Sequence, residues 1–131
     1  MCRTTPRAQR ELPVSHQSPA LAREFLKQVS CKEHHSSLVD DALLLTSELV
    51  TNAVLHGGPP LVIAVDCDGE RLQIRVRDGS PALMPEPRDA GAGEEDGRGL
   101  ALVAAMSDSW GVDPVPDGKY VWFVIQSHDD G

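Results

Sequence analysis

Apolar residues recur at helical spacing in three segments of the chain, at about 18–30, 37–56 and 99–106. Apolar side chains repeated every three or four positions lie on one face of a helix and pack against a core. Ser18 suits the start of the first helix, since its side chain can cap amides and the proline after it fits a first turn. Gly57 and the glycine and prolines that follow it end the second helix. The pattern therefore predicts three helices.

Alternating and β-branched residues form two pairs of short segments, at about 61–67 with 71–77 and at about 110–115 with 120–126. Asp68-Gly69 lies between the members of the first pair and Asp117-Gly118 between those of the second. Asp-Gly is typical of tight hairpin turns, so each pair predicts a β-hairpin. A further short strand, able to join the edge of a sheet, is expected at about 11–15.

The order of these elements predicts the fold class. Grouped helices with two separate hairpins indicate an α+β fold, a two-layer α/β sandwich in which three helices cover one face of a mostly antiparallel, mixed sheet. A chain of 131 residues with 40% hydrophobic residues suits one domain over 1–131. We expect a disordered tail at 1–9. We also expect a mobile loop at 81–97, where prolines, glycines and acids show no periodicity.

Charge and composition exclude several classes of protein. Twenty acidic against twelve basic residues give a net charge of −8 without a basic cluster, so direct binding to nucleic acid is not expected. No apolar stretch is long enough to span a bilayer, and the first residues lack the apolar core of a secretory signal. We therefore expect a soluble cytoplasmic protein. Three cysteines without a close pair argue against both a disulfide framework and a zinc site.

Three polar residues, Glu48, Asn52 and His56, follow one another at four-residue intervals within the apolar second helix. Each four-residue step turns by only about 40° around a helix, so the three side chains lie on one stripe. Apolar residues flank the stripe on both sides, and a carboxylate among apolar neighbours is costly unless it has a partner. A magnesium ion or a catalytic proton is such a partner. The alternative is a half-exposed edge that bonds to nearby loops.

Two further features lie where this stripe needs partners. Asp78 and Gly79 end a predicted strand; the aspartate can accept a hydrogen bond from an exocyclic amine, and the glycine lets a flat ring approach the backbone. Gly97-Arg98-Gly99 precedes the third helix, where amides and the helix dipole favour a phosphate. Taken singly, the first is also compatible with an ordinary turn and the second with a plain helix start.

Together, the order and spacing of these motifs resemble the Bergerat nucleotide fold of the GHKL ATPases. Within that superfamily the chain is similar to the small stand-alone kinases that act as bacterial anti-sigma factors. ELVTNAVLHGG resembles their N box, VRDGSPALMPEPR their first glycine box with its lid, and GRGLALVAAMSDSWGV their second glycine box. The similarity covers nearly the whole chain, from ELPVS to KYVWFVI.

This resemblance implies an ATP-binding serine/threonine kinase that uses Mg²⁺, phosphorylates an anti-anti-sigma partner of the STAS type and binds a sigma factor. Asn52 would ligate magnesium and Glu48 would be the general base. His56 would border the nucleotide, Asp78 would bind the adenine amine, and Gly79 would make room for the ring. The segment 81–97 would be the ATP lid. Phosphate contacts would come from Gly97, Arg98, Gly99 and Leu100. Relatives also suggest a homodimer.

One segment departs from the superfamily pattern. The first glycine box usually reads Asp-X-Gly-X-Gly, whereas this chain has Asp78-Gly79-Ser80-Pro81-Ala82. The departure favours a second hypothesis, a nucleotide-gated or nucleotide-independent module that sequesters a partner without transferring phosphate. A third, the ATP-binding part of a sensor histidine kinase, is less favoured because 131 residues leave no room for a phosphoacceptor helix pair.

Overall fold

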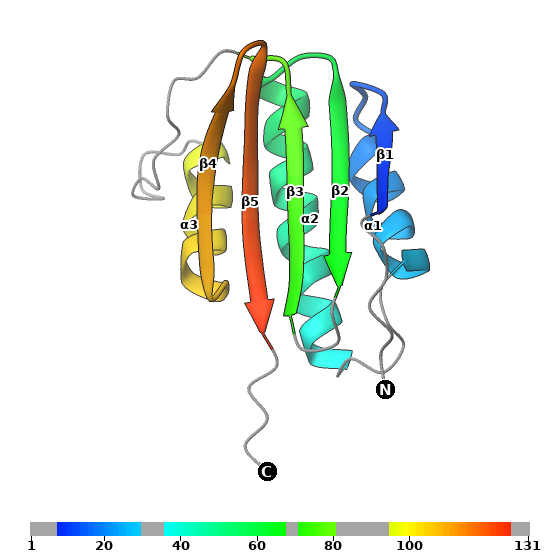
Figure 1. Cartoon of the computed structure of the whole chain (residues 1–131), viewed down its shortest axis with the longest axis vertical. Coiled ribbons are helices and arrows are strands. Elements are labelled where there is room, and N and C mark those ends of the chain that lie inside the picture. Colours follow the sequence, from blue (N-terminus) through cyan, green and yellow to red (C-terminus); the bar gives the residue numbers. More distant parts are fainter. Residues whose placement is uncertain (1–7, 30–35, 68–70, 81–94, 127–131) are drawn as a thin grey trace.

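The computed structural model describes residues 8–29, 36–67, 71–80 and 95–126, and the elements within them form two layers (Figure 1). Three helices lie on one face of a five-stranded sheet, which confirms the predicted α+β sandwich. The elements in chain order are β1 (Ala8–Leu12), α1 (Ser18–Val29), α2 (Ser36–His56), β2 (Leu61–Cys67), β3 (Arg71–Asp78), α3 (Glu95–Met106), β4 (Ser109–Val115) and β5 (Gly118–Gln126).

The strands are arranged in the order β1-β2-β3-β5-β4, and every neighbouring pair is antiparallel. Alternation along each strand separates the two faces of the sheet, because successive side chains point to opposite sides. In β3, Leu72, Ile74 and Val76 are buried on the helix side, while the residues between them are half-buried on the other face. The hydrophobic core therefore lies between the sheet and the helices.

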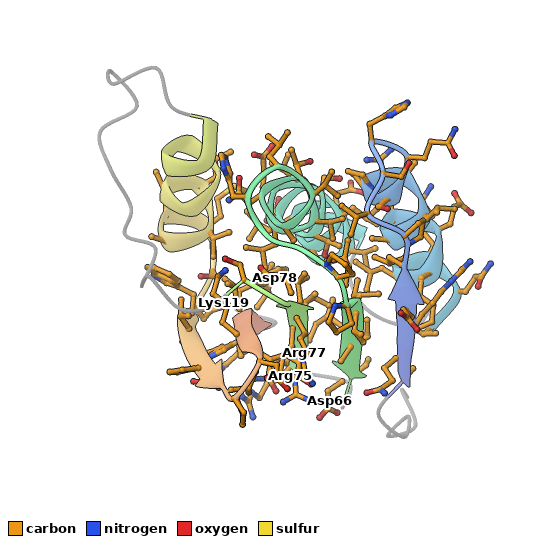
Figure 2. The ribbon with its side chains drawn as sticks, turned by 90° about the horizontal axis from the view of Figure 1, so that it is seen from above. Asp66, Arg75, Arg77, Asp78 and Lys119 are labelled. Atoms are coloured by element: carbon orange, nitrogen blue, oxygen red, sulfur yellow. The ribbon has the colours of Figure 1, made fainter. Side chains whose placement is uncertain are left out.

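Helix α2 lies between α1 and α3 over the middle of the sheet (Figures 1 and 2). Its residues Leu45, Leu49 and Val50 are buried and belong to the core that includes Phe123 of β5. The helix is apolar over most of its circumference because it packs against α1, α3 and the sheet. None of the described helices is both long and apolar enough to cross a membrane.

Two predicted boundaries were wrong. The first strand is Ala8–Leu12 and not 11–15, because Pro13 has no N–H to donate to the ladder; Ala8 and Gln9 thus belong to the sheet and not to a tail. The third helix begins at Glu95 and not at residue 99. Acidic residues suit a first helical turn, and isolated glycines cost only about 1 kcal/mol each. The rest of the predicted lid, 81–94, lies outside the described residues.

The topology brings three element ends to the same end of the sheet. β4 is antiparallel to β5, which is antiparallel to β3, so β3 and β4 run in the same direction. Only two residues separate α3 from β4, so α3 runs the opposite way and begins toward the end of the sheet at which β3 ends. Figure 1 shows the end of β3 and the C-terminus of α2 at the upper end of the molecule, with α3 beginning at its own upper end somewhat lower, at the left.

Candidate functional site

Glu48, Asn52 and His56 lie on α2 as one stripe that runs toward the C-terminus of the helix. Glu48 and Asn52 are half-buried and His56 is exposed. On one flank the apolar neighbours are buried, as expected: Ala42, Leu45, Leu49 and Ala53. On the other flank Leu44 and Leu55 are 43% and 52% exposed. The stripe therefore marks the boundary between the buried and the outward faces of α2, and it is sheltered on one side only.

A contact between α1 and α2 shows which neighbour the stripe faces. The guanidinium of Arg23 in α1 donates to the hydroxyl of Ser47, with 2.8 Å between Nη1 and Oγ, so α1 lies on the Ser47 side of α2. Asn52 is five residues further on, which is about 140° around the helix. The face of α2 that carries Asn52 therefore points away from α1. Figure 2 shows that α3 packs on that opposite side of α2.

Asp78, the last residue of β3, is a buried carboxylate on the helix side of the sheet. Its Oδ1 accepts a hydrogen bond from the backbone N–H of Ser80 at 2.8 Å. The ammonium of Lys119 in β5 lies 3.0 Å from the same oxygen. Figure 2 shows Asp78 and Lys119 together between the sheet and the helical layer. A buried carboxylate needs such partners, because burying it unpaired would cost several kcal/mol.

Close packing ties Asp78 to the end of α2. A Cβ placed on Gly57 would lie 2.7 Å from Cγ of Asp78 and 2.7 Å from the carbonyl oxygen of Ala53. The N–H of Gly79 donates to the carbonyl oxygen of Gly58 at 2.7 Å, which joins the two loops by their backbones. Close contacts with neighbouring atoms therefore require glycine at both Gly57 and Gly79.

The glycine-rich segment 97–100 lies inside α3 and does not precede it. The N–H groups of the N-cap and of the first three residues of an α-helix have no acceptor within the helix, so the amide of Gly97 is the last of this kind in α3, and the helical ladder begins with the amide of Arg98. The amides of Gly99 and Leu100 come after it, where the helix provides an acceptor. The side chains of Arg98 and Leu100 lie outside what the structure describes. An anion would thus meet the first turn of α3 at the same end of the sheet as Asp78 (Figure 1).

Lys119 is a residue of this region that the sequence did not indicate. It is the direct cross-strand partner of Asp78 in the β3–β5 pair. The two residues are 41 positions apart, and their pairing depends on β5 lying next to β3 although β4 precedes β5 in the chain. No local pattern predicts that neighbour. The one available signal was a lysine two positions before the buried Val121 and four before the buried Phe123, and so on the same face of the strand.

The oxygen ligand that the stripe offers is of the kind found in magnesium–nucleotide sites. Magnesium in nucleotide sites is commonly held by one or two protein oxygens, with phosphates and water completing the coordination. The amide oxygen of Asn52 would be one such ligand. Among the described residues no group of three His, Cys, Asp or Glu side chains could hold a metal ion by itself.

A family model described as a histidine kinase-like ATPase domain matches residues 12–125. The chain is also similar in structure to the RsbU and RsbW domains of Rv1364c from Mycobacterium tuberculosis, with a TM-score of 0.67, 19% identity, and coverage of 93% of this chain and 32% of that one. A second similar structure is the histidine kinase domain of a blue-light activated histidine kinase from Erythrobacter litoralis EL346. There the TM-score is 0.50 and the identity 17%, with 88% of this chain and 61% of that one covered. Comparison with curated proteins gives no match.

These likenesses agree with the fold described above. At 19% and 17% identity they show a shared fold alone. The chain spans less than two thirds of each of these longer proteins.

Proposed function

The chain belongs to the histidine kinase-like ATPase domain family, and from this membership we propose that it is an ATP-binding serine/threonine kinase of the anti-sigma-factor type. Its substrate would be a serine on an anti-anti-sigma protein of the STAS type, and a sigma factor would be its second partner. Binding to one partner would then exclude the other and regulate transcription. Similarity to a structure that contains an RsbW domain supports this proposal over other members of the family.

One observation carries the proposal. The stripe on α2 runs toward the end of the sheet at which the carboxylate of Asp78 lies, and α3 begins toward the same end. A nucleoside triphosphate needs an acceptor for its base, an oxygen ligand for its metal and amides for its phosphates. In this proposal those three chemical groups come from three segments that are far apart in the sequence.

Glu48 has the position of a general base in this proposal. It lies one helical turn before Asn52 on the same stripe, half-buried and therefore accessible to a hydroxyl from a second protein. The serine oxygen would bond to the γ-phosphorus as the bond from that phosphorus to the bridging oxygen breaks, ADP would leave, and Glu48 would take the serine proton. Magnesium, when bound, supplies positive charge that stabilises the phosphates in the transition state.

Asn52 would hold the metal through its amide oxygen, and His56 would border the nucleotide at the exposed end of α2. Asp78 would accept a hydrogen bond from the base, and Gly79 would let the ring approach. The first turn of α3 would bind phosphate through the amide of Gly97, and those of Arg98, Gly99 and Leu100 would join only if that turn opened. Because ATP is plentiful inside cells, we propose a cytoplasmic location. We also propose a homodimer, which sedimentation equilibrium would test.

A phosphotransfer assay tests the proposed activity. The protein is incubated with γ-labelled ATP, magnesium and a STAS-domain protein, in parallel with Glu48→Ala. We expect label on the STAS protein with wild type and none above background with the variant. ATP binding, measured separately by calorimetry, should be similar in both. Transfer that is equal in the two proteins would remove Glu48 from the reaction.

A second candidate function is a binding module that sequesters its partner without transferring phosphate. The sequence Asp78-Gly79-Ser80-Pro81-Ala82 supports it, because both glycines expected after the aspartate are replaced. The existing contact of Asp78 with Lys119 supports it as well, since a bound base has to share that carboxylate. Partner binding that persists in the absence of detectable label transfer would favour this candidate.

A further inference from the structure

A positively charged side chain lies beside the carboxylate proposed to bind the base. Nζ of Lys119 is 3.0 Å from Oδ1 of Asp78, and the two side chains are 12% and 5% exposed. The residues face each other directly across β3 and β5. Their separation is therefore fixed by the hydrogen-bonded ladder of two neighbouring strands and not by a loop.

This pair offers hydrogen-bonding capacity that a lone aspartate lacks. A carboxylate accepts at about four positions, and two bonds to Oδ1 are accounted for by Ser80 and Lys119. An ammonium group has three N–H donors, and the bond to Asp78 uses one of them. A ligand that contacts Asp78 thus meets an acceptor and a donor side by side.

The edge of a purine base carries the same two functions. In adenine a 6-amino donor stands next to the ring acceptor N1, whereas in a 6-oxopurine such as guanine or hypoxanthine an oxygen acceptor stands next to an N1–H donor. A carboxylate alone repels the 6-oxo group and leaves it without a donor. With a lysine beside the carboxylate, adenine can place its 6-amino group on Asp78 and its N7 acceptor on Lys119. A shift of the base by one position along the same edge places the N1–H of a 6-oxopurine on Asp78 and its 6-oxo group on Lys119, so the pair satisfies either kind of purine.

We infer that Lys119 is a specificity-determining residue of the nucleotide site, and that it admits 6-oxopurine triphosphates together with ATP. This inference rests on the proposed function, since it takes Asp78 as the residue that binds the base. The lysine supplies the donor that the 6-oxo group requires. The site selects a purine triphosphate and discriminates weakly at position 6 of the ring.

Titration of the wild-type protein with magnesium and ATP, GTP or ITP tests the inference directly. We expect the Kd values for GTP and ITP to lie within about tenfold of that for ATP, because a polar group left without a partner typically costs a factor of about ten to a hundred. ITP matters because it lacks the 2-amino group of GTP and isolates the effect of the 6-oxo group. Binding of ATP with GTP and ITP weaker by more than about a hundredfold would overturn the inference.

Substitution of Lys119 provides the second measurement. Lys119→Met keeps the length of the side chain and removes its donors, so the ratio of the GTP to the ATP dissociation constant should rise by about tenfold or more. Lys119→Arg keeps donors and should hold the ratio near that of wild type. Lys27→Met is the matched control, since Lys27 is an exposed lysine on α1. An unchanged ratio in Lys119→Met would refute the assignment.

The two proposals fail in different ways. If the wild-type protein binds none of the three triphosphates, the proposed function is wrong and the inference is wrong with it. If it binds ATP and rejects both 6-oxopurines, only the role of Lys119 is wrong. Should Lys119→Met lose its folded circular dichroism spectrum, the titration of the wild-type protein decides the matter.

Discussion

Gly57, at the end of α2, lies against the side chain of Asp78, the last residue of β3. A Cβ on Gly57 would be 2.7 Å from Cγ of the aspartate and 2.8 Å from its Cβ, closer than carbon atoms can pack. The glycine is therefore a condition for the aspartate to sit beside the helix. This contact brings the polar stripe of α2 and the buried carboxylate into one region.

Gly57→Ala should destabilise the fold. The new methyl group would meet the Ala53 carbonyl oxygen and the Asp78 side chain at once, and relieving the overlap requires the backbone to shift. We expect a loss of about 1–3 kcal/mol in the free energy of unfolding, as for overpacked positions in general. Urea denaturation followed by circular dichroism measures it. Gly58→Ala is the control, because a Cβ there meets nothing within 4 Å and should change stability by no more than about 0.5 kcal/mol.

The ion pair between Asp78 and Lys119 should show coupling in a double-mutant cycle. Asp78→Asn leaves the largely buried ammonium of Lys119 without a counter-charge, so it should cost about 2 kcal/mol or more. Adding Lys119→Met to that variant should cost less than Lys119→Met alone, since the charge has already lost its partner. Equal costs in both backgrounds would mean that the two groups do not interact in solution. Asp113→Asn, at an exposed position of β4, is the matched control.

Asn52→Ala should remove magnesium-dependent nucleotide affinity and leave the fold nearly intact. Asn52 is half-buried on the stripe, so truncation removes little apolar contact, whereas the proposed metal loses its protein ligand. Calorimetric titration with ATP, with and without magnesium, measures the effect. ATP binding equal to that of wild type would remove Asn52 from the site.

Glu48→Gln should separate binding from chemistry. The amide keeps the size of the side chain but cannot take a proton, so the rate of phosphotransfer should fall at least about a hundredfold while ATP affinity stays within about twofold. Single-turnover transfer from labelled ATP gives the rate. Asp41→Asn, an exposed acidic position earlier on the same helix, should leave it unchanged. A normal rate in the Glu48 variant would show that another group serves as the base.

Gly111→Ala should reduce stability without affecting nucleotide affinity. Gly111 of β4 is the cross-strand partner of Trp122, and a Cβ there would lie 2.7 Å from the indole ring. Trp122 alternates with the core residues Val121 and Phe123, so the overlap falls on the sheet face away from the helices. We expect a loss of about 1–3 kcal/mol in chemical denaturation with an unchanged Kd for ATP. A changed Kd in this variant would mean that general destabilisation lowers affinity, and the other variants would then need correction for it.

The periodicity of the sequence predicted most of the fold. Each helix and strand within the described residues was expected, but the predicted turn was off by one residue: Pro116 and Asp117 form it, and Gly118 already pairs with Val115 as the first residue of β5. The ends that were wrong lie at Ala8–Leu12 and Glu95, where apolar spacing is weak and proline or acidic residues decide the boundary. The stripe of Glu48, Asn52 and His56 could be predicted because residues four positions apart on a helix lie on the same face.

What the sequence determined by itself is which elements form and which of their faces are buried, because both follow from local spacing of apolar and polar side chains. Only the tertiary structure decided which elements are neighbours. Because β5 pairs with β3, Lys119 comes to lie beside Asp78, from which it is 41 residues away in the chain. Gly57 packs against that same aspartate. Strand order depends on how the whole sheet covers the core, and a lysine in an alternating strand carries no information about the residue opposite to it.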